Sequence, residues 1–90
     1  MANGELIIGI VEKIGIGDSA AVPPPIYAEV YYVLGIPVPT KPREGRLQLT
    51  VDPSLNKNQM EASLRAQVAT AVSAITGVAY ATNDVEGCTF

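Results

Sequence analysis

The stretch NQMEASLRAQVATAVSAIT (residues 58–76) decides the fold. Its large apolar residues recur every three or four positions, as on one face of an α-helix. Asn58 followed by Glu61 is typical of a capping box, and Gly77 stands where a left-handed residue often ends a helix. We therefore predict an amphipathic helix over 58–76. Its buried stripe would consist of Met60, Leu64, Val68, Ala71, Val72 and Ile75.

The opposite face of this predicted helix carries small, uncharged residues, with Ala66, Ala69 and Ser73 near its centre. An exposed helix face usually carries pairs of opposite charge. A face of small residues lets a second backbone approach closely, so these three residues are candidates for an interface. The alternative interpretation is that alanine and serine are simply acceptable helix residues here.

Three segments before the helix, 5–14, 26–34 and 46–52, are rich in β-branched or alternating apolar residues and predict strands. A fourth short strand is predicted over 78–82, and residues 83–90 are predicted to form a solvated tail. The expected fold is α+β: a small antiparallel sheet in the order β-β-β-α-β, with the helix packed on one face. The last strand would pair with an edge of the same sheet or with a neighbouring subunit.

The first predicted strand is apolar almost without interruption from Leu6 to Val11. Such a run is typical of a strand covered on both faces. Either the fold itself covers both faces, or one face lies on the core and the other in an interface.

The composition limits the class of protein. A chain of 90 residues is expected to form one domain, 1–90. Its single cysteine, Cys88, cannot form an internal disulfide. Only 17% of the residues are charged, against about 25% in an average globular chain. A surface with so little charge suggests that part of it contacts protein instead of water.

The charge and the hydropathy also exclude several partners. The net charge of −3 provides no general basic footprint, so a nucleic-acid partner is not expected. No apolar run is long enough to span a membrane, and the first residues lack the basic region of a signal peptide. We therefore expect a protein of the cytoplasm or of a virus particle.

Two predicted connections are long for hairpins and rich in proline. We interpret both, residues 15–25 and 35–45, as stiff arms that lie on neighbouring surfaces. The candidate contact residues in them are Pro23, Pro24, Pro25, Pro37 and Pro39.

The second arm and the start of the next strand also hold half of the six basic residues of the chain, Lys41, Arg43 and Arg46. These side chains would contact an anion or an acidic patch on a neighbour, or would remain a solvated charged loop.

Familiar catalytic and cofactor sites do not fit the sequence. The chain has no histidine, which removes the usual triads and most zinc sites. Gly17-Asp18-Ser19 resembles the nucleophile block of the Gly-Asp-Ser-Leu esterases over three residues, but Ala20 stands at the fourth position. Gly15-Ile16-Gly17 is not a phosphate loop, because Pro23–Pro25 prevent the helix that must follow. No cofactor or metal is expected.

These observations predict a non-enzymatic structural or assembly subunit that works through protein–protein interfaces. We expect its partners to be copies of itself, or a capsid or tail protein of a virus particle, in which it would act as a cement, decoration or tail component. Its candidate interface includes Tyr27, Glu29 and Tyr31 on one face of the second strand. One alternative is a soluble adaptor or inhibitor that binds one protein partner. A second is a small enzyme with its site at a subunit interface, using Glu29 and tyrosines as acid and base.

Overall fold

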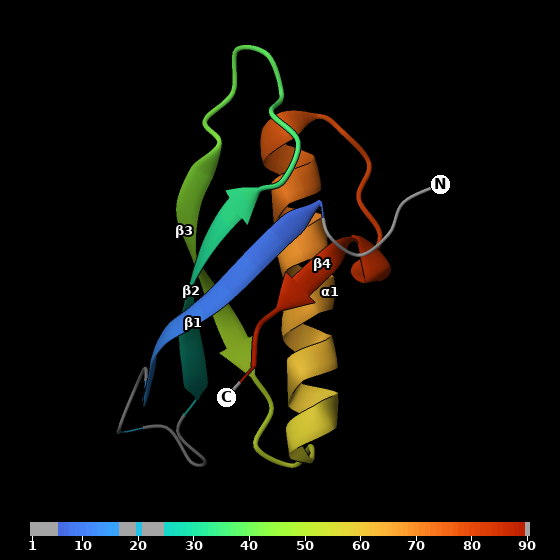
Figure 1. Cartoon of the computed structure of the whole chain (residues 1–90). Helices are drawn as coiled ribbons and strands as arrows, with labels where there is room; N and C mark the ends of the chain where they lie inside the picture. Colours follow the sequence, from blue (N-terminus) through green and yellow to red (C-terminus); the bar gives the residue numbers. More distant parts are fainter. Residues whose placement is uncertain (1–5, 17–19, 21–24, 90) are drawn as a thin grey trace.

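The computed structural model describes residues 6–16, 20 and 25–89. Within these residues, four strands form one sheet in the order β3-β2-β1-β4, and one helix, α1, lies against one face of it (Figure 1). The elements follow the chain as β1 (Ile7–Ile16), β2 (Ile26–Leu34), β3 (Glu44–Val51), α1 (Lys57–Thr76), a 3-10 turn η1 (Thr82–Asp84) and β4 (Val85–Gly87). The predicted α+β class and the order β-β-β-α-β are confirmed.

The sheet is mixed, because its two edges are built differently. The pairings β1–β2 and β2–β3 are antiparallel, whereas β4 runs parallel to β1 and pairs only with Ile7–Gly9. A bulge interrupts β1 between Val11 and Lys13. In Figure 1, the part of β1 that follows the bulge lies farther from α1 than the part before it.

The fourth strand does not lie where the sequence predicts it. Residues 78–81 form an irregular connection, and the strand is Val85–Gly87, inside the segment predicted to be a solvated tail. Val85 and Cys88 are buried in the core, so this segment completes the sheet. The prediction of a strand over 78–82 followed by a tail over 83–90 is therefore wrong in its details.

The core lies between α1 and one face of the sheet. Side chains at alternate positions of each strand point to the helix, as a pleated sheet with one covered face requires. The main buried apolar residues are Ile7, Ala28, Val30, Tyr32, Leu34, Leu49, Val51, Leu64, Val68, Val72, Val85 and Cys88.

The helix begins one residue before the predicted start, and its cap lies two residues earlier. Asn56, not Asn58, accepts a hydrogen bond from the Gln59 backbone N–H, and the Gln59 side chain accepts one from the Asn56 N–H. Both candidate caps have a suitable partner three residues later, so the sequence alone does not separate them. Gly77 ends the helix in the left-handed region, with φ of 76°, as predicted.

The residues of α1 that are buried differ in part from those predicted. At the C-terminal end, Thr76 is buried and Ile75 is 40% exposed, so Ile75 does not belong to the buried stripe. On the face of small residues, Ala69 is itself part of the core. Ser73 accepts a hydrogen bond from the Tyr80 backbone N–H at 2.9 Å. Two of the three predicted interface residues of α1 thus make contacts within the chain itself.

Cys88 anchors the C-terminal segment. Its side chain is 0% exposed and lies over Gly9, where a methyl group added to the glycine would come 2.5 Å from the Cys88 sulfur. The Cys88 N–H donates to the Gly9 carbonyl at 2.9 Å. Burial raises the pKa of the Cys88 thiol above its ordinary value. The thiol is therefore both inaccessible and poorly ionised.

We expect Cys88 to react with a thiol reagent, such as a chromogenic aromatic disulfide, only when the chain unfolds. The attacking species is the thiolate, and a raised pKa lowers its fraction at pH 8. The measurement compares labelling rates in buffer and in denaturant, and the native rate should be lower by roughly a hundredfold or more, as for a group exposed only by opening of the fold. Rapid labelling in buffer would show instead a loosely held C-terminus.

Candidate functional site

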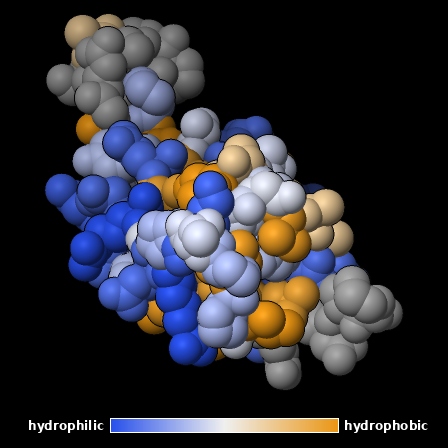
Figure 2. All heavy atoms as spheres, turned by 90° about the horizontal axis from the view of Figure 1, so that it is seen from above, coloured by the Kyte–Doolittle hydropathy of each residue, from blue (hydrophilic) through white to orange (hydrophobic). Residues whose placement is uncertain are grey.

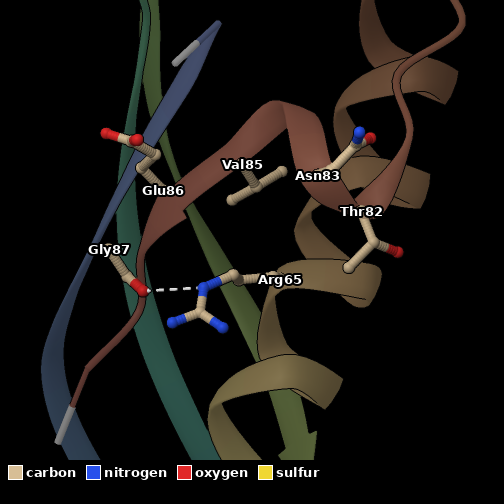
Figure 3. A pocket seen from close by; sticks show the side chains of 6 residues that line it. All are labelled: Arg65, Thr82, Asn83, Val85, Glu86 and Gly87. Atoms are coloured by element: carbon tan, nitrogen blue, oxygen red, sulfur yellow. Dashed lines mark hydrogen bonds between the residues drawn. The ribbon is translucent and has the colours of Figure 1, made fainter. Parts of the chain in front are cut away.

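The face of the sheet opposite α1 is not covered by any described element. We call it the open face. Its residues alternate with those of the core, and Figure 3 shows the start of this alternation in β4, where Val85 points to α1 and Glu86 points away. The open face consists of Ile8, Ile10, Lys13, Tyr27, Glu29, Tyr31, Val33, Glu44, Arg46, Gln48, Thr50 and Glu86.

The centre of the open face is apolar. Ile8 is 45% exposed and lies opposite Val33 in the β1–β2 register, and Ile10 is 50% exposed and lies opposite Tyr31. Val33 and Tyr31 are themselves half-buried. Isoleucine side chains at these positions leave adjacent apolar surface in water, which is the kind of patch that marks an interaction site.

Charged side chains surround this apolar centre and are held in place by one another. Arg46 Nε donates to Glu12 Oε1 at 2.8 Å, an ion pair that spans from β3 to β1. Arg46 reaches β1 across Tyr31 of β2, and its guanidinium carbon lies 5.4 Å from the centroid of the Tyr31 ring, within the range of a cation–π contact. The Tyr31 hydroxyl donates to Glu44 Oε2.

This arrangement affects the titration of its members. The hydrogen bond to Glu44 raises the pKa of Tyr31, because the carboxylate stabilises the protonated phenol. The Glu12 carboxylate likewise raises the pKa of Arg46. Both groups therefore keep their protons throughout the physiological range, and the cluster is a fixed pattern of charge at the rim.

The predicted tyrosine face is part of the open face. Tyr27 lies across Gly15 of β1, so that a methyl group at Gly15 would come 2.8 Å from the Tyr27 hydroxyl oxygen. Tyr27 therefore covers a strand position that has no side chain of its own. Glu29 is half-buried beside it, opposite Lys13 and Gln48 in the register. The fold brings Tyr27, Glu29 and Tyr31 together on one surface.

One position on the outer edge of β3 is occupied by a side chain. The Gln67 amide accepts from the Thr50 N–H at 3.1 Å and donates to the Thr50 carbonyl at 2.8 Å. These are the two bonds that a neighbouring strand would make at this position, so Gln67 blocks strand addition there. Ala66 lines the adjacent hollow of about 400 Å³ between α1 and β3.

A larger hollow, of about 610 Å³, lies between α1 and the C-terminal segment (Figure 3). Arg65 crosses it and donates from Nε to the Gly87 carbonyl at 3.1 Å, and it also lies 4.0 Å from Glu61. These contacts tie the end of β4 to the helix. The hollow therefore contains a structural arginine, with no nucleophile paired with a base among its lining residues.

The two predicted arms differ from the prediction in length, and the first is described only in part. Pro23 and Pro24 lie outside the described residues, and Pro25 is exposed. Residues 15 and 16 belong to β1, and residues 44 and 45 belong to β3, so both connections are shorter than predicted.

The second connection projects beyond the ends of β2, β3 and α1 in Figure 1, although part of it packs against the domain. The Leu34 N–H donates to the Arg43 carbonyl at 2.7 Å, and Val38 packs against the core. Pro37 and Pro39, on either side of Val38, are exposed.

The three basic candidates, Lys41, Arg43 and Arg46, do not form one cluster. Arg46 lies on the open face, bound to Glu12. Arg43 donates from Nε to the Leu34 carbonyl at 3.0 Å, and Lys41 is exposed in the turn that begins at Val38. Only Arg46 therefore belongs to the site described above.

The other exposed apolar side chains form two groups. Ile14 and Ile16 are 47% and 61% exposed on the part of β1 beyond the bulge, opposite Ala28 and Ile26 in the register. Ile36, Ile75 and Val78 are exposed at the end of the molecule where the β2–β3 connection and the C-terminus of α1 lie. Figure 2 looks down from above and shows the apolar side chains as separate patches among polar ones. The open face differs from these groups in that Ile8 and Ile10 lie beside Val33 and Tyr31 and are surrounded by ordered charged side chains.

Comparison of the chain with models of protein families, with curated proteins and with solved structures finds no match. Within the described residues, His, Cys, Asp and Glu side chains form no group of three that would hold a metal ion. Among the same residues, no helix has both the length and the apolar character needed to cross a membrane.

Two features of the site were not predicted from the sequence. The first is the ion pair between Glu12 and Arg46, which are 34 residues apart and come together only through the sheet register. The second is the exposure of Ile8 and Ile10. The uninterrupted apolar run of residues 6–11 is the signal that indicated a second covered face, but it did not identify which residues were uncovered.

Proposed function

We propose that this protein is a non-enzymatic assembly subunit, and that it associates with other protein subunits through the open face. One observation carries the proposal: Ile8 and Ile10, each about half exposed, form an apolar centre with Val33 on a sheet face that the helix leaves bare. Protein interfaces share this plan, with an apolar centre and a polar rim.

The polar groups of the open face support a role in binding. Tyr31 donates to Glu44, and Arg46 is tied to Glu12, so these side chains are ordered before any partner arrives. Side chains that are already ordered lose less conformational entropy when they bind. The same contacts occupy Tyr31, one of the tyrosines that the enzyme alternative would use as an acid or base.

We further propose a virus particle as the setting, with the chain as a cement, decoration or tail component. The low charged fraction of 17% supports this, because a subunit that meets neighbours over much of its surface has less need of charge. The β3 edge also supports it. Because Gln67 occupies the outward bonding positions of Thr50, strand addition is disfavoured at that end of β3, which favours assembly through the face of the sheet.

Ile8→Lys tests the proposed function. A lysine at the apolar centre would place a charge in the interface at a large cost in binding, while the fold is retained because residue 8 faces away from the core. We expect wild type to sediment with a mass that rises with concentration, and Ile8→Lys to remain monomeric.

The matched control is Ile75→Lys, which places the same charge at an isoleucine of similar exposure outside the open face. This variant should associate as wild type does. The proposed function would be refuted if wild type stayed monomeric at millimolar concentration, or if both lysine variants associated as strongly as wild type.

A further inference from the structure

We infer that the partner on the open face is a second copy of this chain, packed face to face about a two-fold axis that crosses the strands. This inference rests on the proposed function and adds the identity of the partner and the contacts that select it. The axis passes midway between the cross-strand pair Ile8–Val33 and the pair Ile10–Tyr31.

The pattern of side chains on the open face determines this geometry. One row across the strands reads Glu44, Val33, Ile8, Glu86, and the next reads Arg46, Tyr31, Ile10. A two-fold axis between the rows places each row opposite the other row of the second copy. Ile8 then meets the second copy's Ile10, and Val33 meets its Tyr31.

The same operation pairs opposite charges. Glu44 faces the second copy's Arg46, and by symmetry Arg46 faces the second copy's Glu44. An isologous interface makes every such contact twice. Charge complementarity of this kind fixes the register of two surfaces and excludes wrong arrangements.

Other two-fold arrangements on this face bring like charges together. An axis parallel to the strands, between β1 and β2, would place Glu44 opposite the second copy's Glu86. An axis across the strands at the Ile8–Val33 row would place Glu44 opposite its own counterpart. Of these three arrangements, only the axis between the rows matches acid with base.

Arg46 and Glu44 each retain hydrogen-bonding groups that are available for the ion pair between the two copies. Arg46 uses Nε for Glu12, which leaves the other N–H groups of a guanidinium that has five donors. Glu44 accepts the Tyr31 hydroxyl at Oε2, which leaves Oε1 for a second donor. The intersubunit ion pair therefore adds to the contacts within each subunit without replacing them.

The size of the face indicates the strength of the association. The two facing rows span about 13 Å along the strands, and at a strand spacing of about 4.8 Å they present roughly 250 Å² on each copy, or roughly 500 Å² for both copies. This area is below that of a stable specific interface, so the two rows alone support only a weak association. The dimer is therefore expected to dissociate on dilution, and to become persistent only where further contacts hold many copies together.

Two single substitutions and their mixture test the geometry. In Glu44→Lys, position 44 would face Arg46 of the second copy, and in Arg46→Glu, position 46 would face Glu44. Each homodimer would bring like charges together twice, so the dissociation constant should rise roughly tenfold or more. An equimolar mixture would instead pair Lys with Glu and Arg with Glu, and should form a heterodimer with an affinity close to that of wild type.

The mixture is also the control for effects within one subunit. Glu44→Lys removes the Tyr31 hydrogen bond and Arg46→Glu removes the Glu12 ion pair, and mixing restores neither of them. Sedimentation velocity measures the association, and native mass spectrometry identifies the heterodimer from the two masses. Thermal unfolding of each variant confirms that it is folded.

The alternative outcomes separate this inference from the proposed function. If the single variants associate as wild type does, or if the mixture stays monomeric, the two-fold geometry is wrong, while loss of association in Ile8→Lys would still support the open face. If wild type itself does not associate, both proposals are wrong.

Discussion

Replacing Gly87 with alanine is expected to detach β4 from the sheet and to lower the free energy of unfolding by about 3 kcal/mol or more. Gly87 has a φ of 82°, a conformation that disfavours any side chain. A methyl group there would also lie 2.2 Å from the Gly9 carbonyl oxygen, a backbone atom that no rotamer change can move. Avoiding this overlap would separate β4 from β1 and expose Val85 and Cys88 to water, at a cost of about 1.5–3 kcal/mol for a buried side chain the size of valine.

Gly77→Ala is the matched control, because Gly77 has a similar φ of 76° but open space around its missing side chain. Its cost should be only that of the backbone conformation, about 1 kcal/mol. Thermal unfolding distinguishes the two, since 1 kcal/mol shifts the midpoint by about 4–8 °C in a domain of this size. Equal shifts for the two variants would contradict the close packing of β4 against β1.

Gly9→Ala is expected to cost about 1–3 kcal/mol, and Cys88→Ala should relieve most of that cost. The added methyl group would lie 2.5 Å from the Cys88 sulfur, which is fully buried and cannot move aside freely. In the double variant, the methyl group added at position 9 would occupy space that the sulfur has left. The cost of the double variant should therefore fall short of the sum of the single costs by about 1 kcal/mol or more.

Denaturant unfolding of the four proteins measures this coupling. Gly9→Ala combined with Gly77→Ala is the comparison, because nothing lies within 4 Å of a methyl group at Gly77. That pair should be additive to within about 0.5 kcal/mol. Additivity of Gly9→Ala and Cys88→Ala would contradict the contact between Cys88 and β1.

The elements predicted from the sequence are those that local patterns define. The apolar spacing of Leu64, Val68 and Val72 is a strong helical signal, and the alternation of Leu47, Leu49 and Val51 is typical of a half-buried strand. The cap of α1 was misplaced because Asn56 with Gln59 and Asn58 with Glu61 are two overlapping candidate boxes. The choice between them depends on how the chain leaves β3.

The C-terminal strand was missed because it depends on contacts with the far end of the chain. β4 has only three residues, pairs in parallel with Ile7–Gly9, and is followed by Cys88 in a left-handed conformation with φ of 57°. None of these properties produces a periodic pattern. Gly9 permits the approach of Cys88, but a glycine in a strand does not indicate which residue will lie over it.

The open face could be predicted in part. Alternation along 26–34 placed Tyr27, Glu29 and Tyr31 on one surface, and the apolar run of 6–11 indicated a second covered face. The partners of Arg46 depended on the bulge after Val11 and on the register of three strands. The contacts that complete the site are thus long-range, whereas its individual residues are recognisable by their local pattern.

A dilution series of ¹H–¹⁵N spectra tests most directly whether copies of this chain meet on the open face. At 9.4 kDa the chain suits this measurement. As the concentration rises, we expect the amide shifts of Ile8, Ile10, Tyr31 and Val33 to move together along one binding curve, while those of Thr70 and Ala74 on the far side of α1 stay constant. Shifts that remain unchanged up to millimolar concentration, or changes confined to α1 and the β3 edge, would contradict the account.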